Sequence, residues 1–489
     1  MKQAPAVMVL GCTSGAGKSW LATALCRWYA RQGLAVKPFK AQNMSNHARV
    51  VALAGGEEGA CGEIGSAQYF QALAARTVPE VRMNPVLLKP EADTRSQVVL
   101  MGRVRPELTG MPWRERSAVL WPTARDALAS LQADCELLVI EGAGSPAEIN
   151  LAADDFVNTF TAQASQAAGL LLADIDRGGA FAHLAGTHAL MDAQVRTQLR
   201  GFVLNRFRGD AALLAPGPQR LEDRTGVPTL AVVPMLREHG LPEEDAVPAD
   251  AEGPGPRVVV LATPHASNLD EFAPLRTAGV SLRFVRDAQS ITDADWLVLP
   301  GSKHTLADLA WLRAQRLDAA IAGHVAAGKP VLAVCGALQW LGRSIDDPLG
   351  LEGGRPASAS GLGLLPLATR FAPAKQLRRV RRRLGALQGA WAPLAGLELD
   401  GYEIHLGQTA ADAALTDAVP AQPGLGWQQG PVLALYLHGL FENPAVLRAL
   451  FGAPRVAVDD PLDAVFERLA DAVDAAFAPG VLMGLLRRG

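Results

Sequence analysis

Short apolar runs alternate with helix-like stretches along most of this chain of 489 residues, and the alternation restarts after a break. Such alternation is typical of a parallel sheet covered by helices, because each parallel strand needs a long crossover to reach the next. The break, residues 242–256, is rich in proline, glycine and acids and shows no periodicity, which indicates a linker. The sequence therefore predicts two doubly wound α/β domains, residues 1–241 and 257–451, and a helical tail in residues 452–489.

The alternation also predicts the individual elements. Gly353–Gly363 and Ala372–Leu387 are expected to form a loop-rich insertion, and Asp459–Phe477 has helical spacing. The expected strands are Ala6–Leu10, Ala35–Phe39, Leu137–Glu141, Gly169–Asp174, Gly201–Asn205 and Thr229–Val233 in the first domain, and Arg257–Ala262, Leu282–Val285, Trp296–Pro300, Val331–Val334 and Val432–Leu437 in the second.

Composition narrows the class of protein. Hydrophobic residues make up 49% and charged residues 19% of the chain, which suits large cores, and the formal net charge of −3 argues against a nucleic-acid partner held by bulk charge. No apolar run reaches the roughly 18–20 residues that span a bilayer, and the first residues do not resemble a secretory signal. Five scattered cysteines predict no disulfide framework. We expect a reduced, cytoplasmic enzyme without a membrane partner; a homo-oligomer stays open.

A glycine-rich segment, residues 11–19, lies between an expected strand and an expected helix, Trp20–Gln32. Glycines let backbone N–H groups approach phosphates, and the helix start adds partial positive charge. Lys18 would reach the outer phosphates of ATP, and Ser19 would ligate Mg²⁺. The alternative is a chance glycine turn before a helix. The glycines assigned to ATP binding are Gly11, Gly15 and Gly17.

Polar side chains at strand ends would complete this site. Glu141 ends an apolar strand, and ligands of open sheets bind beyond the carboxyl ends of strands, so Glu141 should face the triphosphate as a metal ligand. Asp174 and Asp176 end the next strand and are weaker candidates. Asn205 would either contact the adenine edge or cap a turn, and Glu141 could instead be a surface acid.

A second motif places Cys335 at a sharp turn after the apolar strand Val331–Val334. A cysteine at such a nucleophile elbow is exposed by the turn, and the start of the following helix favours its thiolate form. His438, at the end of another apolar run, is the candidate base. The backbone N–H groups of Gly301 and Gly336 would form an oxyanion hole. The alternative is an inert buried cysteine and a turn histidine.

The two sites together suggest an amidotransferase. Cys335 would attack the side-chain amide of glutamine, form a thioester and release ammonia. The ATP domain would activate a substrate carboxylate as an acyl phosphate, which ammonia would displace. The expected small-molecule partners are therefore ATP with Mg²⁺, glutamine and a compound that carries a carboxylate.

Longer blocks of sequence resemble one known family. They are Lys40–Ser45, Glu63–Gln68, Met83–Pro90, Glu141–Leu151, Ala173–Gly179, Asn205–Asp210, Gly401–His405 and Tyr436–Phe441. On these blocks the chain resembles the cobyric acid synthase family of cobalamin biosynthesis, over roughly Val7 to Phe451.

The resemblance implies a dethiobiotin-synthetase-like P-loop domain joined to a class I glutamine amidotransferase domain. It also implies the reaction, which is amidation of the b, d, e and g carboxylates of adenosylcobyrinic acid a,c-diamide. The corrinoid itself does not follow from these residues, which indicate only that Lys40, Lys89 and Arg177 would hold a carboxylate of an acidic substrate. Gln42 is a further candidate for substrate binding, and Gln339 is the candidate for glutamine binding. The cationic residues among them could equally be solvated surface charges.

Some positions depart from the family pattern. Ala333 and Ala337 stand where the family commonly has glycine beside the nucleophile. Leu440 stands where many class I amidotransferases carry a glutamate two residues after the histidine, although the cobalamin branch also lacks it. Glu442 is nearby but is not expected to be catalytic.

Two rival functions stay open at this point. Cobyrinic acid a,c-diamide synthase shares the architecture, although the blocks Gln42–Met44 and Met83–Pro90 favour cobyric acid synthase. A P-loop partition or regulatory ATPase is a rival of another class, and it would not need Cys335 and His438.

Overall fold

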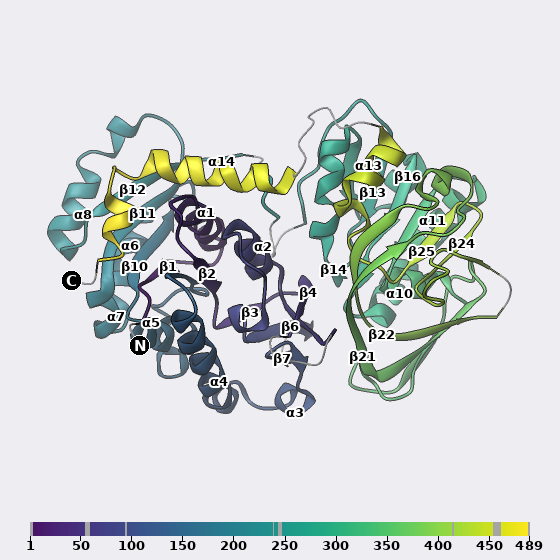
Figure 1. The fold of residues 1–489 in the computed structure, drawn as a ribbon, viewed down its shortest axis with the longest axis horizontal. Helices are drawn as coiled ribbons and strands as arrows, with labels where there is room; N and C mark the ends of the chain where they lie inside the picture. The colour runs from purple at the N-terminus through teal and green to yellow at the C-terminus, as the bar shows by residue number, and fades with distance from the viewer. Residues whose placement is uncertain are drawn as a thin grey trace.

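The computed structural model describes residues 3–53, 59–92, 95–237, 239–242, 247–412, 415–452 and 461–487, which form two lobes (Figure 1). The first lobe holds a six-stranded parallel sheet in the order β12-β11-β10-β1-β9-β2. These strands lie where the sequence predicts them, with small shifts at their ends. They are β1 Ala6–Gly11, β2 Val36–Phe39, β9 Leu137–Glu141, β10 Ala168–Asp174, β11 Leu199–Phe207 and β12 Thr229–Pro234.

Helices cover both faces of this sheet. Successive side chains of a strand point to opposite faces, so in β1 Val7 joins one hydrophobic core and Met8 joins the other. Helix α1 (Lys18–Arg31) packs on the first face and α4 (Trp113–Ala133) on the second. Burial on both faces explains the continuous apolar runs in the sequence. The other helices of this lobe are α2 Ser66–Ala74, α3 Pro106–Thr109, α5 Thr161–Ser165, α6 Ala180–Leu190, α7 Ala193–Gln198 and α8 Gly217–Thr225.

The C-terminal part of the chain returns to the first lobe. Helix α14 (Pro461–Ala476) lies against α1 (Figure 1), and its apolar side chains join the core on that face. Trp28 of α1 donates to Asp474 of α14 at 2.7 Å. A helix is therefore present where helical spacing predicts one, although the expected start at Asp459 lies outside the described residues. A short helix follows, α15 Val481–Gly484.

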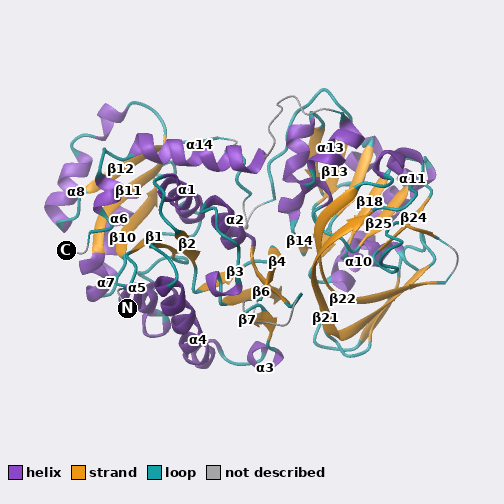
Figure 2. Ribbon diagram, viewed as in Figure 1, coloured by secondary structure: helices purple, strands orange, loops and turns teal. Residues whose placement is uncertain are grey.

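The second lobe holds a seven-stranded sheet in the order β15-β13-β16-β18-β25-β24-β23. Figure 2 shows the second lobe with β13, β18, β25 and β24 of this sheet labelled. Strands β18 (Val331–Val334) and β25 (Val432–Leu435) are buried parallel neighbours, so the strands that precede Cys335 and His438 lie side by side. The remaining strands are β13 Arg257–Leu261, β15 Ser281–Val285, β16 Trp296–Leu299, β23 Thr416–Asp417 and β24 Gly426–Gln429, and the helices are α9 Ala288–Asp293, α10 Thr305–Ala314, α11 Leu317–Ala326, α12 Gly336–Leu341 and α13 Pro444–Phe451.

The expected loop-rich insertion is wrong. Strand β21 (Leu367–Arg383) spans most of Ala372–Leu387 and pairs with β22 (Glu398–Ala411) in a four-stranded sheet. Much of β21 is exposed, so its sequence lacks the alternation that marks a strand with one buried face. Cross-strand charges support the pairing instead, as between Arg381 and Glu398. The other strands of this sheet are β19 Ser344–Asp347 and β20 Ala357–Ser360, the latter inside the expected loop Gly353–Gly363.

Small sheets fill the boundary between the lobes (Figure 2). In the first lobe, β4 and β5 pair with each other and contact β21 of the second lobe. Among the described residues, no helix combines the length and the apolar character needed to cross a membrane. The strands of these small sheets are β3 Gln42–Met44, β4 Ala48–Ala52, β5 Cys61–Gly65, β6 Val86–Ala92, β7 Arg95–Leu100 and β8 Arg103–Val104, with β14 Ala266–Ser267 and β17 Gly301–Ser302 in the second lobe.

Candidate active sites

The glycine-rich segment forms the turn between β1 and α1. Gly17 has a φ of 101°, in the left-handed region that glycine adopts without strain. Lys18 Nζ donates to the backbone oxygens of Thr13 (3.0 Å) and Gly144 (2.9 Å), so the lysine bends back over the loop. A side chain at Gly11 would come within 2.9 Å of that nitrogen. The glycine-rich turn, the lysine side chain and the N-terminus of α1 thus lie together, as they do in a phosphate-binding loop.

Glu141 ends β9 beside this loop and is 1% exposed. Its Oε1 accepts hydrogen bonds from Ser19 Oγ (2.8 Å) and Lys40 Nζ (2.7 Å), and its Oε2 accepts one from Gln71 Nε2 (2.5 Å). Burial alone would raise the pKa of this carboxyl, but the Lys40 ammonium and the hydrogen bonds lower it. Ser19 and Glu141 therefore present two oxygen donors at one point, a donor set that suits Mg²⁺.

Asn205 supports the same loop. Its Nδ2 donates to the backbone oxygen of Ala16 at 2.9 Å, and a Cβ at Gly17 would lie only 2.1 Å from that nitrogen. Position 17 therefore requires glycine for two reasons: its φ is positive, and the Asn205 side chain leaves no room for a Cβ atom. The weaker candidates Asp174 and Asp176 pair with neighbouring arginines. Contact between Asn205 and adenine stays a prediction.

A cavity of about 880 Å³ lies over the phosphate loop, between the two lobes. Ligand pockets commonly measure about 300–1,000 Å³, so this one lies near the upper end of that range. The second lobe contributes part of its wall through Thr263, Leu269 and Arg286. From the first lobe come Gly15, Gly17, Lys18, Ser19, Lys40, Glu141, Arg177 and Asn205, among others.

Cys335 occupies the turn between β18 and α12 with a φ of 52°, a strained value for a residue other than glycine. Its backbone N–H donates to the oxygen of Leu435 in β25 at 2.8 Å. Ala333 and Ala337 are fully buried on either side, so alanine fits where the family commonly has glycine. The backbone therefore adopts the nucleophile elbow that the sequence predicts.

His438 follows β25, is 1% exposed, and lines the same cavity as Cys335. Its Nδ1 lies 2.8 Å from Glu271 Oε1, and the Gly439 N–H donates to Glu271 Oε2 at 2.7 Å. Burial alone would lower the pKa of His438, but the Glu271 carboxylate and the Cys335 side chain raise it to about 10. The imidazolium form is therefore favoured at neutral pH.

Gly301 and Gly336 pack closely around the elbow. A Cβ at Gly301 would lie 3.2 Å from His438 Cε1 and 3.7 Å from Cys335 Cβ. A Cβ at Gly336 would lie 2.9 Å from the backbone nitrogen of Ser302. The structure thus brings both glycines to the thiol, while their role as an oxyanion hole stays a prediction.

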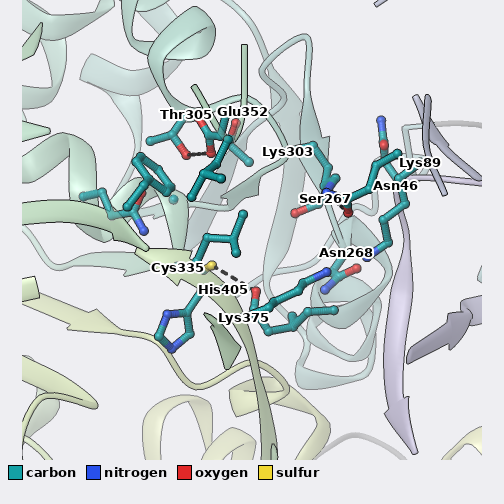
Figure 3. Close-up of a pocket in the computed structure, with 18 of the residues that line it drawn as sticks. Asn46, Lys89, Ser267, Asn268, Lys303, Thr305, Cys335, Glu352, Lys375 and His405 are labelled. Carbon is teal, nitrogen blue, oxygen red and sulfur yellow. Dashed lines mark hydrogen bonds between the residues drawn. The ribbon is translucent and has the colours of Figure 1, made fainter. Parts of the chain in front are cut away.

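A small cavity of about 60 Å³ lies over Cys335 and takes its walls from both lobes. Figure 3 shows Asn46 and Lys89 of the first lobe facing the second-lobe residues of this pocket. Gln339 lines it as well and donates from Nε2 to the Tyr436 hydroxyl at 3.1 Å. Its buried Oε1 has no hydrogen-bond partner within the described part of the chain, which leaves an acceptor for a bound ligand.

Charged side chains of both lobes meet beside this small cavity. The fully buried Glu63 accepts hydrogen bonds from Lys89 and, across the boundary, from Lys375 (2.5 Å). Burial alone would raise the pKa of Glu63, but the two ammonium groups lower it to about 2. Lys303 also lines the cavity, and it donates to Gln97 Oε1 at 3.3 Å.

The structure does not gather all the residues expected at the carboxylate substrate. Lys40 and Arg177 line the large cavity, Lys89 lines the small one, and Gln42 lines neither. Lys40 also pairs with Glu141, so it stands at the expected metal site. Within the described ranges, no group of three or more His, Cys, Asp or Glu residues could hold a metal alone. A cation at Ser19 and Glu141 would therefore also need oxygens of the nucleotide.

Sequence reasoning missed Glu271, the carboxylate that holds His438. The two residues are 167 positions apart, so no spacing links them. Glu271 lies in the 3₁₀ helix η5 (Leu269–Ala278), directly after Asp270. The one available signal is this acidic pair between apolar residues, and it does not reveal which residue the pair contacts.

Comparison with known families agrees with both sites. Residues 7–246 match the CobQ/CobB/MinD/ParA nucleotide binding domain, and residues 257–446 match the CobB/CobQ-like glutamine amidotransferase domain. Fold and sites together thus define a nucleotide-binding domain joined to a glutamine amidotransferase domain.

Full-length relatives identify the family. A protein of Leptothrix cholodnii named cobyric acid synthase is 60% identical, with 99% of this chain and 97% of that protein covered. One of the same name from Methylibium petroleiphilum is 61% identical with the same coverage. This chain belongs to the cobyric acid synthase family. The resemblance and the two-domain fold are therefore confirmed, and neither rival function is favoured.

Proposed function

We propose that this enzyme uses ATP and glutamine to amidate the b, d, e and g carboxylates of adenosylcobyrinic acid a,c-diamide. The family assignment supports the reaction. The observation that carries it in the structure is the arrangement of the two cavities. Asn46 lines both the pocket of Cys335 and the large cavity over the phosphate loop, so ammonia released at the thiol would pass to the ATP site where the two cavities share this residue.

Glutamine hydrolysis would proceed at Cys335. The thiol proton passes to His438, the sulfur attacks the amide carbon, and the resulting imidazolium gives its proton to the amide nitrogen, which leaves as ammonia while a γ-glutamyl thioester remains on Cys335. Water, activated by the now neutral His438, then cleaves the thioester. Glu271 keeps the imidazole ring oriented and favours its charged form. The N–H groups of Gly301 and Gly336 would stabilise the oxyanion.

Recognition of free glutamine would use the polar wall of the small cavity. Gln339 has a buried acceptor, Oε1, that suits the α-ammonium group of glutamine. Lys89 and Lys375 both pair with the single carboxylate of Glu63, whereas no carboxylate lies within ion-pair distance of Lys303 in the described ranges. Lys303 is therefore the best-placed cation for the α-carboxylate.

The phosphate loop would activate the corrinoid carboxylate. Lys18 would leave its two backbone acceptors to contact the outer phosphates and balance charge during transfer of the γ-phosphoryl group. Ser19 and Glu141 would hold Mg²⁺, which supplies charge neutralisation at the phosphates when bound. Ammonia then displaces phosphate from the acyl phosphate. The proposal includes a cytoplasmic location and no nucleic-acid or membrane partner.

The direct test is a mass measurement. Purified enzyme is incubated with ATP, Mg²⁺, glutamine and the corrinoid diamide, and the product is followed by mass spectrometry. The proposal predicts four successive replacements of a hydroxyl by an amino group. A substrate mass that stays constant while glutamine is hydrolysed would contradict it.

A further inference from the structure

Arg49 is a buried arginine of the first lobe that reaches into the second. It lies in β4, and its side chain is 2% exposed. One terminal nitrogen donates to Asp270 Oδ2 at 2.5 Å and the other to Glu442 Oε1 at 2.5 Å. Both acids belong to the second lobe, so a single guanidinium joins two segments across the boundary.

Aromatic rings enclose the same guanidinium. Its central carbon lies 5.6 Å and 5.2 Å from the ring centroids of Tyr69 and Phe70 in α2, and 5.4 Å from that of Tyr402 in β22. A planar cation that combines ring contacts with two ion pairs has little freedom to move. Arg49 therefore fixes its neighbours in one arrangement.

Two of the second-lobe neighbours of Arg49 either contact His438 or directly precede a residue that does. Asp270 directly precedes Glu271, which contacts the imidazole. The Tyr402 ring stacks on the His438 ring with centroids 5.1 Å apart and planes 13° apart, and the backbone N–H of His438 donates to the backbone oxygen of Tyr402 at 2.9 Å. Glu442 follows His438 by four residues.

The residue before Arg49 fixes the same segment. The Ala48 N–H donates to Asn268 Oδ1 at 2.9 Å. Asn268 has a φ of 54° and stands directly before η5, the helix that carries Glu271. Two consecutive residues of β4 thus hold the start of η5, one through its backbone and one through its side chain.

We propose that Arg49 is a positioning residue for glutamine hydrolysis, which holds η5 and Tyr402 so that Glu271 orients His438. Glutamine hydrolysis then depends on the seating of the ATP domain against the amidotransferase domain. Arg49 lines neither cavity and so touches neither the thiol nor a bound ligand there. The inference rests on the proposed role of Cys335 and His438 in hydrolysis.

The test compares Arg49→Met with Arg49→Lys by steady-state glutamate release. Met keeps most of the side chain but removes the cation, so Asp270 and Glu442 both lose their contact with the guanidinium. We expect kcat to fall about 30- to 100-fold, the scale of a displaced catalytic group, with KM for glutamine little changed. Lys restores one charge and should recover part of kcat. Amidation with ammonium salt should persist in both variants.

Arg27→Met is the matched control. Arg27 is also buried and paired with two acids, Asp463 and Glu467, and it faces the ring of Phe466, but these contacts lie within the first lobe. Its loss should lower the thermal midpoint and leave kcat for glutamine hydrolysis unchanged. An unchanged kcat in Arg49→Met would overturn the proposal. So would a parallel loss of kcat and stability that Arg27→Met reproduces and Arg49→Lys does not relieve. No glutamate release by the unchanged protein would instead contradict the proposed function.

Discussion

In the phosphate site, Lys18 and Glu141 are held by first-lobe residues, whereas the orientation of His438 beside Cys335 involves contacts between the two lobes. Lys18 is held by Thr13 and Gly144, and Glu141 by Ser19, Lys40 and Gln71. The thiol pocket takes one wall from the first lobe, and Arg49 supports the segment that orients His438. Damage to the thiol site should therefore spare ATP chemistry, while glutamine chemistry should depend on both lobes.

The largest expected effect is at the thiol. Cys335→Ala removes the group that attacks glutamine, so glutamate release should fall by about four orders of magnitude or more. Ammonium salt should restore amidation, better at alkaline pH, because more free ammonia is then present. The measurement is product formation with glutamine and with ammonium, in parallel.

Cys135→Ala is the control for this variant. Burial raises the pKa of Cys135 to about 11, and Cys135 lines neither cavity, so its loss should change neither activity. Equal activity of Cys335→Ala with both nitrogen sources would make the elbow a structural turn. If a Cys335→Ala variant that still binds ATP makes no product with either glutamine or ammonium, the two sites do not act separately.

Lys18→Ala should impair the phosphate site and leave the thiol site intact. It removes a charge contact to the transferred phosphoryl group, worth about a hundred- to a thousand-fold in rate. Amidation should fall with either nitrogen source, while glutamine hydrolysis continues. Lys37→Ala, which removes a lysine paired with Glu80 away from both cavities, should leave amidation intact. Near-normal amidation by a folded Lys18→Ala variant would refute the phosphate site.

Glu271→Gln sharpens the comparison through pH. Among the groups around His438, Glu271 raises the pKa of the imidazole, Cys335 also raises it, and Tyr402 stacks on the ring. Because the imidazolium must protonate the amide nitrogen before it can leave as ammonia, hydrolysis should fall as pH rises through that pKa, at about 10. Without the carboxylate the fall should come at lower pH, and kcat should drop about 100-fold. Superimposable pH profiles would show that Glu271 does not act on His438.

The smallest effect is expected at the metal. Glu141→Gln keeps the shape of the side chain but removes the anion beside Ser19. The Mg²⁺ concentration needed for half-maximal amidation should then rise at least about tenfold, and glutamine hydrolysis should not change. A Mg²⁺ titration that overlays that of the unchanged enzyme would exclude Glu141 as a ligand.

The phosphate site could be predicted from the sequence more completely than the thiol site. The phosphate loop is contiguous, so strand, glycines, lysine and helix start are visible within residues 6–32, and the structure places them as expected. Cys335 and His438 could be predicted because each follows an apolar strand. Glu271 could not, since its partner is distant in sequence and the contact depends on how η5 is seated.

Charged residues were the hardest to place. Lys89 is a predicted ligand of a substrate carboxylate, and in the structure it is buried against Glu63 and lines the thiol pocket. Arg49 gave no sign in the sequence, because a buried arginine and a solvated one look alike there. The long strand β21 was missed because charged residues interrupt its alternation. In each instance tertiary pairing, which sequence patterns do not contain, decides the environment.

The most direct test of the account is the origin of the new amide nitrogen. The unchanged enzyme is given glutamine labelled with ¹⁵N in its side-chain amide, together with unlabelled ammonium salt, and the product is analysed by mass spectrometry. If ammonia passes from Cys335 to the phosphate site within the molecule, the new amides carry ¹⁵N well above its share of the free ammonia pool, and Cys335→Ala incorporates none. Label that only matches the free pool, or that appears equally in Cys335→Ala, would contradict the account.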